Sequence, residues 1–350
     1  MRTVQGILSK LYTENNLTKD NMIWLLENMD KKGKELLFDY ARKTRNRCYG
    51  DRVFMRGLIE FSNICSRNCI YCGIRASNKN VARYRLTKDE ILDCCKEGYD
   101  LGYRTFVLQG GEDGWYTADR VADIVSSIKE LFPKVAVTLS LGERSYHDYR
   151  LWYETGADRY LLRHETASRQ LYERLHPDGD FDNRRECLFS LKEIGYQVGA
   201  GFMVGLPGQS VYNLVEDIYF LKELNADMIG IGPFIPAQNT PLGKEGGGKV
   251  EDVLVMLALV RLMLPLTLLP ATTAMGTLDP KGREKALKAG GNVVMPNLSP
   301  IATKSKYQLY DNKICTGDES AHCRVCIENR INSIGMKVDM GRGDSLVHLN

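Results

Sequence analysis

The pattern of hydrophobic and polar positions changes near residue 50. Before that point, apolar side chains recur every three or four residues, as one face of a helix requires. They are Leu8, Leu11, Met22, Leu25, Leu26, Met29, Leu36, Leu37 and Tyr40. Thr18 and Asp20 are candidate helix N-caps. We therefore predict an N-terminal helical extension over residues 1–50.

From residue 51 onward, short apolar or β-branched runs alternate with longer amphipathic segments. The runs that predict strands are 55–61, 105–109, 136–141, 160–163, 198–204, 228–234, 268–273 and 293–295. The segments that predict helices are 88–101, 118–131, 147–155, 183–194, 211–224, 250–263 and 280–289. Strands separated by such helices pair in parallel through crossovers. The pattern predicts an α/β protein with a (β/α)8 TIM-type barrel over residues 51–300; a doubly wound open sheet is the alternative.

Polar residues and glycines follow several predicted strands at the same end. Gln109 and the next three residues, Gly110-Gly111-Glu112, follow the second strand, and Ser140 ends the third. In a parallel barrel the carboxyl ends of all strands lie on one face, where the active site is built. We therefore expect the functional residues on that face.

Composition narrows the possible partners and surroundings. The chain has 47 Lys and Arg against 44 Asp and Glu, a formal charge of +3, without the concentrated basic stripe of a nucleic-acid binder. The apolar run 253–270 is interrupted by Arg261 and Pro265, which favours a buried helix over a membrane span. The N-terminus lacks the apolar stretch of a signal peptide, and ten cysteines then favour a reducing compartment. We expect a cytoplasmic protein with no nucleic-acid or membrane partner.

Three cysteines carry the main chemical signal. Cys65, Cys69 and Cys72 have a C-x3-C-x2-C spacing, and such thiolates can hold three irons of a cubane 4Fe-4S cluster while the fourth iron stays open. A structural zinc site, which normally has four ligands, or unrelated thiols are the alternatives. Tyr71 precedes the third cysteine, where an aromatic ring could pack against a nucleobase. This segment resembles the signature of the radical SAM enzymes, in which the open iron chelates S-adenosylmethionine and an electron from the cluster releases a 5′-deoxyadenosyl radical.

A basic group surrounds the cysteine segment. It is either a solvated face or a docking surface for an acidic redox partner. Its members are Arg67, Arg75, Lys79, Arg83 and Arg85.

Further polar residues form two candidate sets at the barrel mouth. Gly110-Gly111 allows close backbone approach to a ligand, Glu165 is suited to ribose hydroxyls, and Arg184 to a carboxylate. A second set, suited to an anion deeper in the barrel, is Arg159, Arg163, Thr272 and Thr273. Ordinary surface charges, and threonines that satisfy a tight turn, are the alternatives.

A second cysteine group lies in the C-terminal segment, residues 301–350. Cys315, Cys323 and Cys326 have a C-x7-C-x2-C spacing. An iron–sulfur cluster is favoured over zinc or free thiols, because one cluster already implies an anaerobic setting.

The chain as a whole resembles the HydE-type maturases of FeFe hydrogenases, in the group that includes biotin synthase and methylornithine synthase. The resemblance covers nearly the whole sequence. It rests on IEFSNICSRNCIYCGIR, RYRLTKDEI, VLQGGED, VTLSLGE, GADRYLLRHETA, MVGLPGQ, DMIGIGPFIP, PATTAMGT and the tail from Tyr307 to Cys326.

This resemblance assigns roles to individual residues. It implies that Cys65, Cys69 and Cys72 bind the cubane and that Tyr71 flanks the adenosyl group. The residues that would hold S-adenosylmethionine are Gln109, Gly110, Gly111, Glu112, Ser140, Glu165 and Arg184. Those that would line the substrate cavity are Arg159, Arg163, Met228, Thr272, Thr273 and Tyr307. Cys315, Cys323 and Cys326 would hold an accessory 2Fe-2S cluster.

The resemblance also implies a reaction and partners. The enzyme would help build the di-iron subcluster of the hydrogenase H-cluster from a cysteine-bound iron carbonyl cyanide complex, with radical attack at the thiolate sulfur. Other maturases would supply and receive the iron precursor, and a ferredoxin- or flavodoxin-type protein would donate electrons. Another radical enzyme of the biotin synthase or methylornithine synthase type, or a non-catalytic iron–sulfur scaffold, are the alternatives.

Overall fold

Six parallel strands form one continuous sheet in the computed structural model, which describes residues 2–317 and 319–349. The strands are β2 (Gly57–Ser62), β3 (Thr105–Gly110), β4 (Ala136–Ser140), β5 (Arg159–Leu161), β6 (Gln197–Val204) and β7 (Met228–Pro233). Within this sheet they pair in sequence order, as consecutive β–α units require. Their backbones therefore all present carboxyl ends to the same face.

Short segments complete the ring between β7 and β2. The segment 268–270 makes parallel bridges to β7 on one side and to β8 (Val293–Val294) on the other. Residues 296–298 then close the ring on Leu58 of β2, through backbone hydrogen bonds of 2.8 and 2.7 Å. The predicted barrel is confirmed, although its seventh and eighth strands are shorter than the apolar runs suggested.

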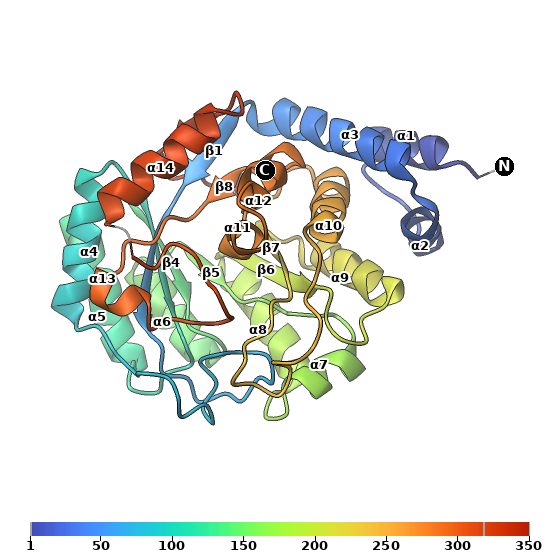
Figure 1. The fold of residues 1–350 in the computed structure, drawn as a ribbon. Helices are drawn as coiled ribbons and strands as arrows, with labels where there is room; N and C mark the ends of the chain where they lie inside the picture. The colour runs from blue at the N-terminus through green and yellow to red at the C-terminus, as the bar shows by residue number, and fades with distance from the viewer. Residues whose placement is uncertain (1, 318, 350) are drawn as a thin grey trace.

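Helices surround the strands on the outside (Figure 1). They are α4 (Lys88–Asp100), α5 (Ala118–Leu131), α6 (Tyr146–Thr155), α8 (Phe181–Ile194), α9 (Val211–Leu224), α10 (Val250–Met263) and α12 (Gly282–Lys288). Each lies within two residues of its predicted bounds. Pattern reading missed the short helices α7 (Arg169–Leu175), α11 (Thr273–Leu278) and α13 (Ile301–Lys304), because four to seven residues are too few to show a helical period.

Three helices precede the barrel: α1 (Val4–Glu14), α2 (Lys19–Asn28) and α3 (Lys31–Tyr49). The Thr18 side chain accepts the Asn21 N–H and caps α2, whereas Asp20 lies inside that helix. α3 packs against α10 and α2 against α9. Among the described residues, no helix, α10 included, combines the length and apolarity needed to cross a bilayer.

The C-terminal segment returns to the barrel after α14 (Ser320–Asn332). β9 (Lys337–Asp339) pairs with β1 (Arg52–Met55), which also pairs with β8, and the last element is α15 (Leu346–Leu349). One hydrophobic core includes Leu8 from the N-terminal helices and Ile327 from α14. The three-part division at residues 50 and 300 stays a prediction, since all three parts share this core.

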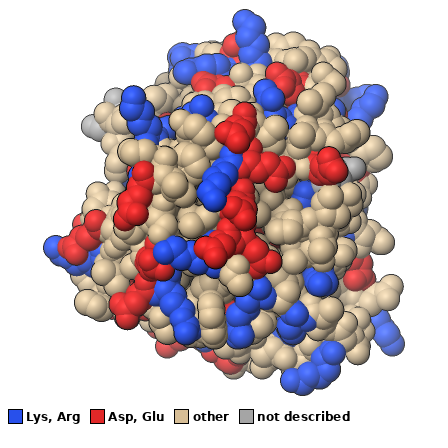
Figure 2. Space-filling view, turned by 90° about the vertical axis from the view of Figure 1, so that its left-hand side faces the viewer, with Lys and Arg blue, Asp and Glu red and all other residues tan. Residues whose placement is uncertain are grey.

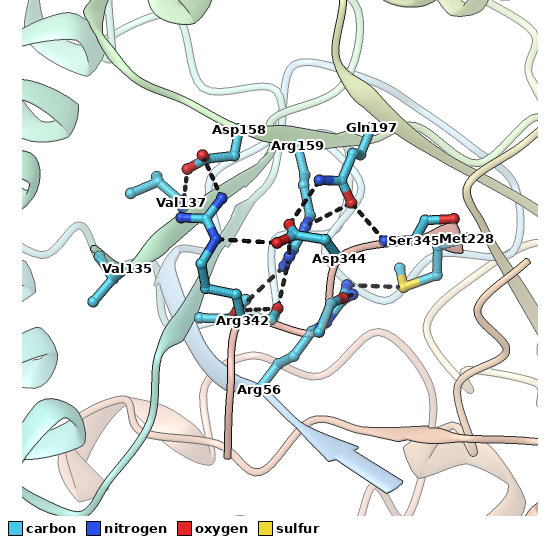
Figure 3. Close-up of polar contacts among 12 residues, drawn as sticks. Arg56, Val135, Val137, Asp158, Arg159, Gln197, Met228, Arg342, Asp344 and Ser345 are labelled. Atoms are coloured by element: carbon cyan, nitrogen blue, oxygen red, sulfur yellow. Dashed lines mark hydrogen bonds and ion pairs between the residues drawn. The ribbon is translucent and has the colours of Figure 1, made fainter. Parts of the chain in front are cut away.

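Residues 342–345, the floor strap, cross the barrel at the amino ends of its strands (Figure 3). Arg159, the first residue of β5, is 2% exposed and donates to Asp344 Oδ1 at 2.7 Å and to the Arg342 carbonyl at 2.6 Å. Gln197 of β6 donates to the same Asp344 oxygen at 2.7 Å. The strap therefore supplies the counter-charge for an arginine buried inside the barrel.

Loss of the Asp344 charge should destabilise the fold. Breaking a buried ion pair leaves an uncompensated charge, so Asp344→Asn should lower the free energy of unfolding by about 3 kcal/mol at pH 7, measured in guanidinium titrations. Asp51→Asn removes an exposed ion pair, with Lys337 and Asp51 side chains 78% and 45% exposed, and should change the stability very little. Equal losses of stability in the two variants would show that Asp344 does not act as the counter-charge of a buried arginine.

The ion pair between Arg159 and Asp344 should also make the stability of the fold depend on pH. Burial would raise the pKa of Asp344, but Arg159, Gln197 and Arg342 outweigh it and hold that pKa well below its usual value. A carboxyl with a lowered folded-state pKa stabilises the fold above its unfolded pKa of about 3.9, and this stability is lost as the pH falls toward the folded value. The stability difference between the wild type and Asp344→Asn should therefore shrink below about pH 4.

Candidate active site

A cavity of about 370 Å³ occupies the barrel interior. It extends from the carboxyl ends of the strands to Met228, the first residue of β7. Many residues predicted from the sequence line it: Tyr71, Cys72, Gln109, Ser140, Arg163, Glu165, Met228, Thr272 and Thr273. The fold therefore brings strand-end residues from six different strands and loops to one enclosed space.

The cysteine loop connects β2 to α4 over residues 63–87. Arg83 organises it, since its guanidinium donates to the backbone carbonyls of Asn63, Ile74, Arg75 and Asn78 at 2.5–3.1 Å. These contacts bind both ends of the loop to one rigid fork of donors. The loop can therefore hold a fixed shape although it has no helix or strand of its own.

The three thiols of this loop lie in a poorly solvated environment. Burial raises the pKa of Cys69, and the neighbouring thiols Cys72 and Cys65 raise it further. Burial also raises the pKa of Cys72 to about 12. Neutral thiols are thus favoured until a cation offsets the cost of burying thiolates. This behaviour suits metal ligands, although no three ligand-type side chains among the described residues converge as the ligands of one metal ion would.

The glycines after β3 meet this loop directly. The Gly111 N–H donates to the Ser62 carbonyl at 3.1 Å, and a Cβ at Gly111 would lie 2.3 Å from the Ile64 carbonyl oxygen. The next N–H, of Glu112, points at Cys65 Sγ at 3.4 Å. Only glycine permits this approach at residue 111, which places the backbone of Gly111 and Glu112 against Cys65.

Glu165 and Arg163 face the cavity after β5. Glu165 has a left-handed backbone (φ 64°) and is held by its N–H on the Gly201 carbonyl at 2.9 Å. Its Oε2 lies 3.1 Å from Arg163 Nη2, yet both atoms are buried without a hydrogen bond. Unsatisfied buried polar atoms at a cavity mark a place for a polar ligand.

His164 plays a structural part between these two residues. Its ring contacts Asp217 Oδ1 at 3.3 Å through Nε2 and the Gly201 N–H at 3.3 Å through Nδ1. Burial lowers the pKa of His164 to about 3, so the ring is neutral. It orients the segment that carries Arg163 and Glu165 rather than acting as a base in the cavity.

Arg184 lies behind the cavity wall and is held by a carboxylate that sequence reasoning did not select. Its Nε donates to Glu143 at 2.6 Å, and its Nη1 donates to the Arg163 carbonyl at 3.0 Å. The side chain of Glu112 does not face the cavity but pairs with Arg67 at 2.6 Å. Glu143 lies in the segment VTLSLGE. A charged residue just after a strand end was the sequence signal that could have identified it.

The deeper part of the cavity has hydroxyls and cations. Thr272 Oγ1 is buried without a hydrogen-bond partner, and Thr273 Oγ1 accepts from Arg283 at 3.1 Å. Arg283 is 7% exposed, lines the cavity and also contacts Cys315 Sγ at 3.7 Å. Sequence reasoning missed Arg283 because it lies on the short helix α12, and no local pattern shows that its side chain turns back to Thr273, ten residues earlier.

A buried ion pair forms another part of this wall. Glu60 of β2 pairs with Lys313 at 2.5 Å, and both residues line the cavity. Lys313 also donates to the Tyr307 carbonyl at 2.8 Å. The predicted residue Tyr307 itself is behind the wall, where its hydroxyl accepts from Gln109 at 3.2 Å. The C-terminal segment therefore supplies part of the cavity wall.

Arg159 is placed differently from the other predicted substrate residues. It does not line the cavity, and its guanidinium is occupied by the floor strap and by Thr105 Oγ1 at 3.2 Å.

The C-terminal cysteines are only partly brought together. The pKa of Cys323 is raised mainly by a hydrogen bond with Cys315, and burial raises it further. Cys326 is exposed on α14. Two of these three thiols are therefore adjacent, with the third at the surface.

The basic group near the cysteine loop is largely occupied internally. Arg67 pairs with Glu112 and Glu143, Arg83 binds loop carbonyls, and Arg85 pairs with Asp113 at 2.7 Å. On the face drawn in Figure 2, acidic and basic side chains are interspersed. Most of this group serves the loop itself, and its exposed members are Lys79 and Arg85.

Comparison with known proteins agrees with this geometry. Residues 59–221 match the Radical SAM superfamily. The chain is 48% identical to the "[FeFe] hydrogenase maturase subunit HydE" of Thermotoga maritima over 96% of this chain and 95% of that protein. It is 30% identical to a 3-methylornithine synthase of Methanosarcina barkeri over 92% and 90%. A crystal structure of methylornithine synthase superposes with a TM-score of 0.84 at 28% identity, covering 95% and 97%.

The barrel, the cysteine loop at its mouth and the superfamily match define a radical SAM enzyme. Such an enzyme binds a 4Fe-4S cluster and S-adenosylmethionine. Within this class, the chain belongs to the HydE family of [FeFe] hydrogenase maturases. The residues present fit both groups: half-buried thiols beside a glycine backbone, and unsatisfied polar atoms of Arg163 and Glu165 at the adjoining cavity.

Arg83 should determine how firmly the loop retains iron. Arg83→Gln removes the guanidinium and most of its carbonyl contacts, and one charge-assisted hydrogen bond is worth about 1.5 kcal/mol, so iron should be lost roughly tenfold faster to a chelator. The matched control Lys79→Gln changes an exposed residue of the same loop and should retain iron like the wild type. Equal retention by both variants would show that Arg83 does not organise the site.

Proposed function

We propose that this radical SAM enzyme acts on a cysteine-bound iron carbonyl cyanide complex during assembly of the di-iron subcluster of [FeFe] hydrogenase. The observation that carries the proposal is the continuity of the cavity, which runs from Cys72 at the mouth to Thr272 and Met228 in the interior. An electron-rich complex with a carboxylate and cyanide ligands suits the cations and unpaired hydroxyl in the interior.

The mouth residues are assigned to the cluster and to S-adenosylmethionine. Cys65, Cys69 and Cys72 would hold the cluster. The cluster and S-adenosylmethionine, when bound, supply a 5′-deoxyadenosyl radical. The backbone carbonyls of Gly110, Gly111 and Glu112 would accept hydrogen bonds from the cofactor's ammonium group. The remaining cofactor residues are Tyr71, Gln109, Ser140, Glu165 and Arg184.

The interior residues are assigned to the substrate. Arg163, Thr272, Thr273 and Met228 line this part of the cavity, with Tyr307 behind it. Arg283 takes the place that sequence reasoning gave to Arg159, because its guanidinium lies beside Thr273 whereas that of Arg159 is paired with Asp344.

The closed floor supports radical chemistry in this cavity. Arg159, Gln197 and the floor strap fill the amino end of the barrel, so substrate and cofactor share the carboxyl end. A reactive primary radical must be kept from water and from stray C–H bonds. The floor residues thus act by keeping water away from the radical.

The C-terminal cysteines and the partners complete the proposal. Cys315, Cys323 and Cys326 are assigned to an accessory 2Fe-2S cluster that is dispensable for cofactor cleavage. A ferredoxin- or flavodoxin-type protein would reduce the first cluster. Other maturases would deliver the iron complex and accept the product, as expected for a family defined by hydrogenase maturation.

Activation of a hydrogenase tests the proposal most directly. A host that lacks its own HydE-type maturase should regain [FeFe] hydrogenase activity when this chain is expressed, and a Cys65→Ala chain should not restore it. If the wild-type chain cleaves S-adenosylmethionine in vitro but never restores hydrogenase, the substrate proposal is wrong and the radical chemistry stands.

The two cysteine groups should behave differently. Replacing Cys65, Cys69 or Cys72 by Ala should abolish release of 5′-deoxyadenosine after anaerobic reconstitution, because the open iron needs all three ligands. The triple variant Cys315→Ala, Cys323→Ala, Cys326→Ala should lose iron but still cleave the cofactor. If the triple variant keeps its first cluster and its fold but loses cleavage, the accessory assignment fails.

The two layers of the cavity should separate in binding and maturation assays. Arg184→Gln should weaken S-adenosylmethionine binding roughly ten- to a hundredfold, since a charge-assisted hydrogen bond is worth about 1.5–3 kcal/mol. The paired change Thr272→Val, Thr273→Val should leave that affinity nearly unchanged and abolish hydrogenase activation. Calorimetry and activation of apo-hydrogenase measure the two effects. A large loss of cofactor affinity in the threonine variant would contradict the layering.

A further inference from the structure

We infer that Glu143 is a positioning residue that fixes the cysteine loop and Arg184 relative to one another. Its carboxylate is 5% exposed and receives donors from both sides. Arg67, between Cys65 and Cys69 in the chain, donates to Glu143 Oε2 at 2.9 Å. Arg184, on α8, donates to Glu143 Oε1 at 2.6 Å. One carboxylate thus joins the loop assigned to the cluster and the arginine assigned to the cofactor.

The chain holds Glu143 in place by a glycine turn after β4. Gly142 has a left-handed backbone (φ 75°), and a Cβ there would lie 2.1 Å from Glu112 Cγ. The Gly142 carbonyl accepts the hydroxyls of Tyr160 at 2.9 Å and Tyr149 at 3.3 Å. The Glu143 N–H donates to Glu112 Oε1 at 3.2 Å. The turn is therefore fixed by contacts on several sides, so that the carboxylate has little freedom to move.

The charged side chains around Glu143 are equal in number. Arg67 and Arg184 bring two positive charges, and Glu112 and Glu143 bring two negative charges. Glu112 bonds Arg67 at 2.6 Å but is 3.9 Å from Arg184, so Glu143 is the close partner of Arg184. Asn183 adds a further donor to Glu143 at 2.7 Å. Without Glu143, the Arg184 guanidinium would keep a single short bond, to the Arg163 carbonyl.

This arrangement leaves part of Arg184 available for a ligand. Its Nε is used by Glu143 and its Nη1 by the Arg163 carbonyl, while Nη2 lies 3.9 Å from Glu112 and the Tyr172 hydroxyl also contacts the guanidinium. A planar guanidinium fixed at two atoms presents its remaining donors in one direction, which suits a carboxylate. The inference rests on the proposed assignment of Arg184 to the cofactor, and it gives Glu143 a role through Arg184, without cofactor contact.

Cofactor binding measured with the full-length, anaerobically reconstituted protein tests this inference. Glu143→Gln keeps the shape but removes the charge, and it should weaken S-adenosylmethionine binding roughly tenfold in a titration followed by the electron paramagnetic resonance of the reduced cluster. The KM for S-adenosylmethionine should rise while kcat at saturation falls much less. Iron content should stay unchanged, because Arg67 keeps its bond to Glu112. Glu154→Gln, which removes an exposed ion pair on α6, is the matched control and should bind like the wild type.

The double variant Glu143→Gln, Arg184→Gln shows whether the two residues act together. If Glu143 acts through Arg184, the double variant should bind S-adenosylmethionine no more weakly than Arg184→Gln alone. Wild-type affinity in Glu143→Gln, strictly additive losses in the double variant, or loss of iron from Glu143→Gln would each overturn the inference. Failure of the wild-type enzyme to activate hydrogenase would overturn the proposed substrate and leave this result untouched.

Discussion

Charged side chains buried inside a hollow barrel need partners, and this requirement shapes the whole molecule. Burying an unpaired charge is costly, so each one must meet a counter-charge, a set of neutral hydrogen-bond acceptors or a ligand. At the floor, Arg159 meets Asp344; in the wall, Glu60 meets Lys313; at the mouth, Arg184 meets Glu143. Polar atoms of Arg163, Glu165 and Thr272 that make no hydrogen bond lie at the cavity, together with the Glu60–Lys313 pair in its wall. The cavity wall thus combines a closed ion pair with polar groups that make no hydrogen bond.

The C-terminal segment contributes more than a second cysteine group. Lys313 supplies the counter-charge to Glu60, and the Leu309 carbonyl accepts the Gly73 N–H next to Cys72 at 2.8 Å. Further on, Asp344 neutralises Arg159 at the opposite end of the barrel. A segment that follows the last barrel strand thus contacts the cysteine loop, the cavity wall and the floor. This placement makes the segment an integral part of the barrel, whatever its cysteines bind.

Arg283 connects the cavity wall to the C-terminal cysteine group. Its guanidinium bonds Thr273 in the proposed substrate layer and contacts Cys315 in the C-terminal segment. The mouth has a corresponding connection, in which Glu143 joins Arg67 of the cysteine loop to Arg184. In both places arginine donors take part in contacts between separate elements of the fold.

The sequence by itself determined the features that depend on local order. The C-x3-C-x2-C spacing, the alternation of strand and helix patterns and the polar residues after each strand depend on neighbours within a few positions, so they predicted the barrel, the cysteine loop and the face that carries the site. Tertiary structure alone decided which charges meet. Arg159 and Arg163 are four residues apart, at the start and just past the end of one short strand, yet one faces the floor strap and the other the cavity. Glu143, Arg283 and Lys313 gain their positions from contacts with residues 41, 10 and 253 positions away, and ion pairing depends on strand register and side-chain direction, which no local pattern records.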